Sequence, residues 1–439
     1  MKIIKVNGLT PIQSGMLFQY MLSNDKSSYM GTEIFELEGN INSDIFKSVL
    51  EKISDEYEVF RTNVIYDKID VPKSVVIDKR TIPFEFHKAV TDEEIKLLTY
   101  KINAEQFEKG FDIQRDSLIR LDLIVGENSS VIIFSFHHIL MDGYCAAMIA
   151  DIIMKNYGKL LGRQIENDGE YVPFSAYQDW IIIQDMSQSR EYWHEYLKDI
   201  SPVQPLELIQ FGSDRKKDVG HSSLTVEFTP SETKELLSAA AAGNATLNIY
   251  MQWLWGITLC RNFSCDKAVF GTVVSYRPAE FSNAERVLGP MINTVPVVFE
   301  CSSDIKITEQ LNAFRRSFLD SMEHSWIGLG EISKAVEDCK NLIDHLFVYD
   351  NFPEMDFGSI KENTGFQVKN FKLEERTEYA LTLEVSKTDR IRIRFNFNSG
   401  RYSAESIERL AELYKNICVS AVNAQYPKDI ENISAVSYT

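Results

Sequence analysis

A stretch without any secondary-structure period divides this chain into two halves. Residues 201–223 (SPVQPLELIQFGSDRKKDVGHSS) are polar, contain two prolines and follow neither the helical nor the strand period. With 439 residues, the chain exceeds the roughly 250–300 at which one hydrophobic core stops growing, so two domains are expected. We predict an N-terminal lobe over 1–183, a connecting helix and linker over 184–222, and a C-terminal lobe over 223–439.

Both halves alternate segments of helical spacing with short β-branched and aromatic runs, which predicts a mixed α/β fold. Thr10 precedes Pro11, and Ser43 precedes an amphipathic segment, so these two residues are predicted to cap helices. The predicted helices are 9–22, 43–57, 143–161, 231–242, 247–261, 307–322 and 403–422, and the predicted strands are 32–39, 131–136, 223–228, 268–275, 294–299, 346–352 and 390–398.

The composition disfavours several classes of protein. A formal net charge of −18 argues against a basic face that neutralises nucleic-acid phosphates. The six cysteines form no CxxC pair and no cluster with histidines, so free thiols are expected rather than zinc ligands or disulfides. No signal peptide and no apolar run of about 18 residues is present. We expect a soluble, cytoplasmic protein without a metal, a membrane contact or a nucleic-acid partner.

The segment SFHHILMDG (135–143) places two histidines at the end of an apolar strand. Side chains alternate along a strand, so His137 and His138 point to opposite faces and cannot easily bind one metal ion. A histidine at the end of a buried strand, beside a charged loop, favours proton transfer over a purely structural role. The spacing therefore indicates a site that handles a proton.

Two residues after the histidine pair have a structural and a functional interpretation. Asp142 stands where a helix begins, and aspartate is a preferred N-cap. Gly143 follows it, either because the turn needs a glycine or because its amide faces a developing negative charge, as amides at helix N-termini do. Spacing alone does not separate these interpretations.

HHILMDG (137–143) resembles the HHxxxDG signature of the condensation domains of nonribosomal peptide synthetases. Six more segments resemble motifs of that family, in the family's order along the chain. They are LTPIQSGML (9–17), EVFRTNV (58–64), YVPFSAYQDW (171–180), VVSYRPAE (273–280), VLGPMINTVPV (287–297) and HLFVYDNFP (345–353). The resemblance spans about 9–400, nearly the whole chain.

The resemblance implies two chloramphenicol-acetyltransferase-like α/β lobes in a V, with the active site in a central tunnel. A floor loop at about 273–294 and a latch at about 377–393 are implied to cross between the lobes. The implied reaction joins a donor aminoacyl or peptidyl thioester to the amine of an acceptor aminoacyl thioester. Both arrive on 4′-phosphopantetheine arms of upstream and downstream carrier proteins, with an adenylation domain in the same assembly line. The domain itself is expected to bind no cofactor and to be a monomer.

The resemblance also assigns roles to single residues. His138 becomes the catalytic residue, either as general base or as the group that orients the amine, and Gly143 is a candidate oxyanion donor. Asp142 is implied to pair with Arg277 and to tie the lobes together. His137 and Arg61 are expected to be structural.

Two further residues are candidates for the tunnel floor. Tyr276 replaces a common glycine in VVSYRPAE, and Asn293 belongs to the INT motif.

Several alternatives stay open. An acyltransferase of the same fold that acts on small molecules would use acyl-CoA, and a non-catalytic relative would only recruit partners. Epimerisation domains share HHxxxDG, but the segments at 9–17, 58–64 and 287–297 are closer to condensation domains. Local similarity at TPIQSGMLF and SFHHILMDG further predicts a donor with a D-configured terminal residue.

Overall fold

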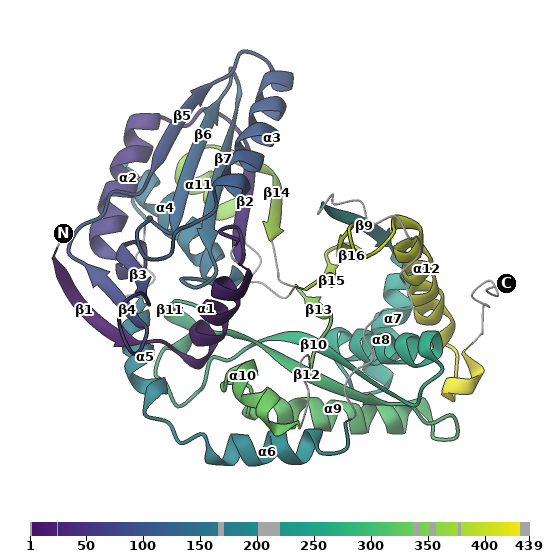
Figure 1. Ribbon diagram of the computed structural model, residues 1–439. Coiled ribbons are helices and arrows are strands. Elements are labelled where there is room, and N and C mark those ends of the chain that lie inside the picture. Colours follow the sequence, from purple (N-terminus) through teal and green to yellow (C-terminus); the bar gives the residue numbers. More distant parts are fainter. Residues whose placement is uncertain are drawn as a thin grey trace. The chain divides into compact units, whose positions relative to one another are not determined.

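The computed structural model describes residues 2–23, 25–165, 171–200, 220–336, 342–350, 357–375 and 379–430 (Figure 1). The chain forms two compact α/β units, which confirms the predicted class. Unit 1 consists of 1–185, 277–292 and 352–378. Unit 2 consists of 186–276, 293–351 and 379–439. Most of the non-periodic stretch, 201–219, lies outside the described residues.

Unit 1 is built on a five-stranded sheet with the strand order β14-β2-β7-β6-β5. Its strands are antiparallel except for the parallel pair of β5 and β6. The central strand β7 carries the histidine pair at its end. The strands are β14 (Gln367–Glu375), β2 (Met30–Glu38), β7 (Ser129–His137), β6 (Ile119–Val125) and β5 (Phe84–Lys88).

Helices cover both faces of this sheet. The residues of one face pack with α1 (Pro11–Ser23), α2 (Ser43–Glu56) and α4 (Gly143–Leu160) in the main core of the unit. The other face packs against α3 (Asp92–Lys109) through a smaller cluster of Ile and Val side chains. Because helices pack on both faces, a buried polar side chain on β2 or β7 must find a partner inside the protein.

Smaller elements complete unit 1. A three-stranded sheet has the order β1-β4-β3, and a two-stranded parallel sheet joins β11 to β8. These elements are β1 (Ile3–Gly8), β3 (Thr62–Ile65), β4 (Lys73–Ile77), β8 (Val172–Pro173), β11 (Val287–Leu288), α5 (Phe174–Ile182), α11 (Phe357–Thr364) and the 3-10 turns η1 (Glu58–Arg61) and η3 (Ala284–Arg286).

Two segments from the second half of the chain belong to unit 1. Residues 277–292 bring β11 to β8, and β14 pairs with β2 as the edge strand of the main sheet. The latch predicted at about 377–393 is not one of these two segments. Within the described part of that range, β15 (Leu381–Lys387) and the start of β16 (Ile391–Asn398) pair with strands of unit 2. The strand that extends the sheet of unit 1 is β14, which precedes the predicted latch in the sequence.

Unit 2 contains a six-stranded sheet with the order β12-β10-β13-β15-β16-β9. Its most buried helix is α8 (Leu247–Phe263), where Trp253 and Trp255 are fully buried, as expected for a helix that is apolar all round. The other elements are β9 (His221–Glu227), β10 (Lys267–Ser275), β12 (Ile292–Glu300), β13 (Leu346–Tyr349), α6 (Ser187–Leu197), α7 (Pro230–Ala242), α9 (Ile307–Glu323), α10 (Leu329–Ile332), α12 (Ala404–Ala421), η4 (Ser333–Ala335) and η5 (Pro427–Asp429).

The helix caps confirm one expectation and correct another. Thr10 Oγ1 accepts a hydrogen bond from the Gln13 amide at 3.2 Å, so Thr10 caps α1 as predicted. Ser43 was the predicted cap of α2, but the cap is Asn42, whose Oδ1 accepts from the amides of Asp44 and Ile45. The prediction was wrong by one residue because Asn and Ser are equally good caps and adjacent here.

Among the described residues, no helix is both long and apolar enough to cross a membrane.

Candidate active site

The histidine pair lies at the end of β7, where the strand turns into α4. Residues 138–142 connect the last strand residue, His137, to the first helical residue, Gly143. Both imidazoles are buried, with His137 fully buried and His138 8% exposed. They contact different surroundings, as the alternation of a strand predicts.

The His138 imidazole is held by three neighbours. Its Nδ1 lies 3.2 Å from the carbonyl oxygen of Met141, and its Nε2 lies 3.1 Å from Oε1 of Glu375. The ring of Phe136 packs edge-on against it, with 5.1 Å between centroids. Burial disfavours the imidazolium, but the Glu375 carboxylate, the Met141 carbonyl and Asp142 outweigh this, so the pKa of His138 is raised.

Gly31 makes this packing possible. It lies opposite Phe136 in the pairing of β2 with β7. A Cβ at position 31 would come within 2.5 Å of the Phe136 ring, so a larger residue would displace the ring that contacts His138. The glycine therefore belongs to the support of the site.

The His137 imidazole is neutral and contacts the turn that follows it. Its Nδ1 accepts a hydrogen bond from the Ile139 amide at 3.0 Å, and its ring packs edge-on against Tyr20 and Phe111. Burial, with the charge of His138, lowers the pKa of His137 to about 3. An imidazole that stays neutral and holds the turn fits the structural role expected from the sequence.

Asp142 joins three chain segments. Its Oδ1 accepts the Cys145 amide at 2.9 Å, which makes it the N-cap of α4. Its Oδ2 accepts the Met291 amide at 2.9 Å and lies 3.5 Å from Nη2 of Arg277. The same guanidinium donates to the Ala284 carbonyl at 2.8 Å.

The pairing of Asp142 with Arg277 lies entirely within unit 1. The sequence-based expectation that it ties the lobes together is therefore corrected. The pair fixes the segment 277–292 to the N-terminus of α4, because Met291 and Arg277 both belong to that segment.

Gly143 is the first residue of α4, directly after the cap. Amides in the first turn of a helix have no intrahelical acceptor, and they favour a negative charge nearby. The position is compatible with an oxyanion donor next to the His138 imidazole.

The sequence reasoning missed two acidic residues, one that contacts His138 and one whose pKa the first affects. Glu375 ends β14 and contacts Nε2 directly, and Glu33 lies on β2 with its Oε2 buried and without a hydrogen bond. Glu33 lines a void of about 10 Å³, about the size of one water, and its other lining residues are apolar. Burial, with the charge of Glu375, raises the pKa of Glu33 to about 8. The signal for Glu33 was one acid on the otherwise apolar face of a strand, whereas no local signal marks Glu375.

The raised pKa of Glu33 predicts a pH-dependent stability. Between the ordinary value of 4.5 and about 8, the folded state binds more protons than the unfolded state, so stability falls as the pH rises. From pH 5 to pH 8, we expect the free energy of unfolding of the wild type to fall by about 3 kcal/mol more than that of Glu33→Gln. Urea unfolding at both pH values measures this, with the substitution Glu36→Gln of an exposed glutamate on the same strand as the control. If the free energy of unfolding changed equally with pH in the wild type and in Glu33→Gln, the raised pKa of Glu33 would be contradicted.

Of the remaining predicted residues, Arg61 belongs to unit 1, and Tyr276 and Asn293 belong to unit 2. Arg61 donates to the backbone carbonyls of Ser54, Asp55, Ile77 and Asp78, so it holds α2 to β4 and does not contact the HHILMDG segment through these bonds. Asn293 belongs to unit 2, where its Nδ2 donates to two carbonyls that follow α9. Tyr276, the last residue before the segment 277–292, is half-buried.

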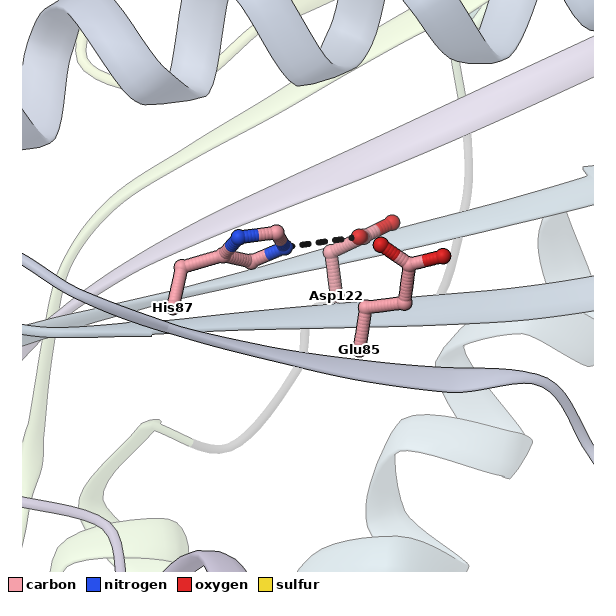
Figure 2. Close-up of side chains that lie close together, drawn as sticks. All are labelled: Glu85, His87 and Asp122. Carbon is pink, nitrogen blue, oxygen red and sulfur yellow. Dashed lines mark hydrogen bonds and ion pairs between the residues drawn. The ribbon is translucent and has the colours of Figure 1, made fainter.

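A second cluster lies on β5 and β6 (Figure 2). Glu85, His87 and Asp122 place their ligand atoms within 4.8 Å of one another, the one such group among the described residues. His87 Nε2 is 3.1 Å from Asp122 Oδ1, and Gln106 donates to the other oxygen at 2.8 Å. These hydrogen bonds already satisfy Asp122, and the cluster lies outside the contacts of His138.

Fold and site together define an α/β protein with a buried imidazole between a strand end and a helix N-terminus. The sequence pattern of the family "Condensation domain" matches residues 4–436. This chain belongs to the condensation domains of nonribosomal peptide synthetases. Condensation domains of these synthetases are acyl- or peptidyltransferases that form amide bonds.

Relatives show how the chain compares with longer proteins. Gramicidin S synthase 2 of Aneurinibacillus migulanus is 30% identical over 94% of this chain, which covers 9% of that synthase. Tyrocidine synthase 2 of Brevibacillus parabrevis is 28% identical over 94% of this chain and 12% of its own length. The chain thus spans less than a fifth of these two relatives.

The fold also matches solved structures. The first condensation domain of the calcium-dependent antibiotic synthetase, in complex with a substrate analogue, has a TM-score of 0.78. The match covers 98% of this chain and 100% of that domain at 14% sequence identity. At this identity the match establishes the fold.

Proposed function

We propose that this chain forms an amide bond between two thioester-bound substrates, each carried on the phosphopantetheine arm of its own carrier protein. The observation that carries the proposal is the His138 imidazole, held at the N-terminus of α4 within a chain that matches the condensation family over nearly its whole length. An upstream carrier supplies the donor, a downstream carrier supplies the acceptor, and an adenylation domain belongs to the same assembly line.

The reaction balances without a cofactor. The acceptor amine attacks the donor carbonyl, the C–N bond forms and the C–S bond breaks. The amine loses one proton, and the departing pantetheine thiolate gains one. Positioning of the two reactants contributes much of the rate, because well-oriented groups can lower a barrier by about 7–11 kcal/mol.

His138 is the residue that handles the proton. With Nδ1 held at the Met141 carbonyl, Nε2 is the nitrogen that accepts the proton from the attacking amine or orients that amine. The Gly143 amide at the start of α4 stabilises the oxyanion of the tetrahedral intermediate. Asp142 and Arg277 keep α4 and the segment 277–292 in place.

Location and donor stereochemistry complete the proposal. We place the chain in the cytoplasm, a reducing compartment in which the free thiols of the five described cysteines would persist. The local similarities at 10–18 and 135–143 support a donor that ends in a D-configured residue. Matched D- and L-terminated donors on the same carrier test this, and faster transfer of the L-form would overturn it.

A single-turnover assay tests the function. Two loaded carrier proteins are mixed with the chain, and intact-protein mass spectrometry follows the donor acyl group. We expect its mass to move from the donor carrier to the acceptor carrier. A parallel reaction supplies the same acyl group as acyl-CoA with a free amine. Turnover in that reaction alone would assign the chain to the CoA-dependent acyltransferases.

A further inference from the structure

The two polar contacts of His138 need two protons between them. A neutral imidazole beside a carboxylate has only one. Nδ1 faces the Met141 carbonyl at 3.2 Å, and Nε2 faces Glu375 at 3.1 Å. Carbonyl and carboxylate oxygens only accept hydrogen bonds, so both contacts need a proton on their nitrogen. Either His138 is an imidazolium, or Glu375 carries the proton that bridges to Nε2.

The surroundings favour the imidazolium. The titratable and charged groups that face this ring are Glu375 from β14, Asp142 at the start of α4 and His137 on its own strand, with Glu33 on β2 behind Glu375. His137 stays neutral, and burial keeps Glu33 protonated below about pH 8. The remaining charged neighbours, Glu375 and Asp142, both stabilise a positive imidazole.

We propose that Glu375 is a positioning residue for the transfer: its carboxylate holds the Nε2 proton of His138 and so sets the pH above which this imidazole can accept a proton from the amine. The proposal rests on the proposed function, whose reaction it regulates. It adds a residue that lies outside the HHILMDG segment.

The proton balance gives the order of events. Before it can act as a base, the His138 imidazolium must release its Nε2 proton, to water or to Glu375. The amine then replaces Glu375 at Nε2, and the proton lost during C–N bond formation moves to this nitrogen. That proton leaves with the pantetheine thiolate, and the contact with Glu375 forms again when the proton first released returns from water or from Glu375. Glu375 therefore competes with the amine for the same nitrogen.

Substitution of Glu375 by glutamine tests the proposal through the pH profile. Glu375→Gln keeps the shape but removes the charge, so we expect the acid limb of the transfer rate to move to lower pH. At pH 6 the variant then reaches a larger share of its plateau rate than the wild type does. Glu375→Asp keeps the charge, and we expect its acid limb to lie between that of the wild type and that of Glu375→Gln.

Glu374→Gln is the matched control. Glu374 is the preceding residue on β14, on the other face of the strand, and accepts a hydrogen bond from Asn103 at 2.8 Å. A purely structural role of this strand end would lower the rate at every pH in both variants without moving the limb. An unmoved limb in Glu375→Gln, with the wild type active, overturns the proposal.

A second measurement needs no substrate. NMR titration of ¹³C-labelled histidine in the unloaded domain reports the pKa of His138, whose resonance is the one absent from His138→Gln. We expect this pKa to fall in Glu375→Gln and to stay unchanged in Glu374→Gln, and an unchanged pKa in both overturns the proposal. If no carrier pair supports transfer, the proposed function fails, while this titration still decides whether Glu375 holds the proton.

Discussion

His138→Ala is expected to slow carrier-to-carrier transfer by about 10²–10⁴-fold, the range that general acid–base catalysis contributes. The loss arises because Nε2 of His138 is the nitrogen that accepts the proton of the amine, and the methyl group of alanine has no atom that can do so. Single-turnover transfer, read by intact-protein mass spectrometry, measures the change.

The substitution should leave the fold intact. The imidazole of His138 has one backbone contact, and its other polar partner, Glu375, is 22% exposed and can be hydrated. We therefore expect the melting temperature of His138→Ala to stay close to that of the wild type. His194→Ala, on an exposed position of α6, is the control for loss of a histidine. A full rate in His138→Ala would remove His138 from the mechanism.

Asp142→Ala is expected to destabilise the protein by about 3–5 kcal/mol, the usual result of breaking a buried ion pair by removing one partner. The carboxylate is fully buried, whereas the Arg277 side chain is 11% exposed. Its removal leaves the amides of Cys145 and Met291 without their acceptor and the guanidinium without its counter-charge. Urea unfolding measures the loss.

The structure also predicts where the loss appears. Because Asp142 Oδ2 holds Met291 and Arg277, amide hydrogen exchange should accelerate first in 277–292 and in the first turn of α4. Asp142→Asn, which keeps one carbonyl oxygen for the Cys145 amide, should lose less. An Asp142→Ala protein that is inactive but as stable as the wild type would show that the carboxylate acts on the substrate instead.

The sequence determined the local framework of the site. The apolar run before His137, the alternation of the two histidines and the capping aspartate are all signals of short range. Together they place His138 at a strand end and Gly143 at a helix start, as β7 and α4 do in the structure. Most of the expected helices and strands were found for the same reason. The cap of α2 was misplaced because Asn42 and Ser43 carry the same local signal.

The surroundings of His138 were decided by the tertiary structure. Glu375 reaches Nε2 because β14 pairs with β2, a contact between opposite ends of the sequence that no local pattern encodes. The same pairing places Glu33 near a second carboxylate inside an apolar face, which raises its pKa. The segment 277–292 likewise joins unit 1 through long-range contacts, the pairing of β11 with β8 and the hydrogen bond from Met291 to Asp142. Periodicity and capping act over a few residues, whereas the protonation of a buried imidazole depends on every charge that the fold brings to it.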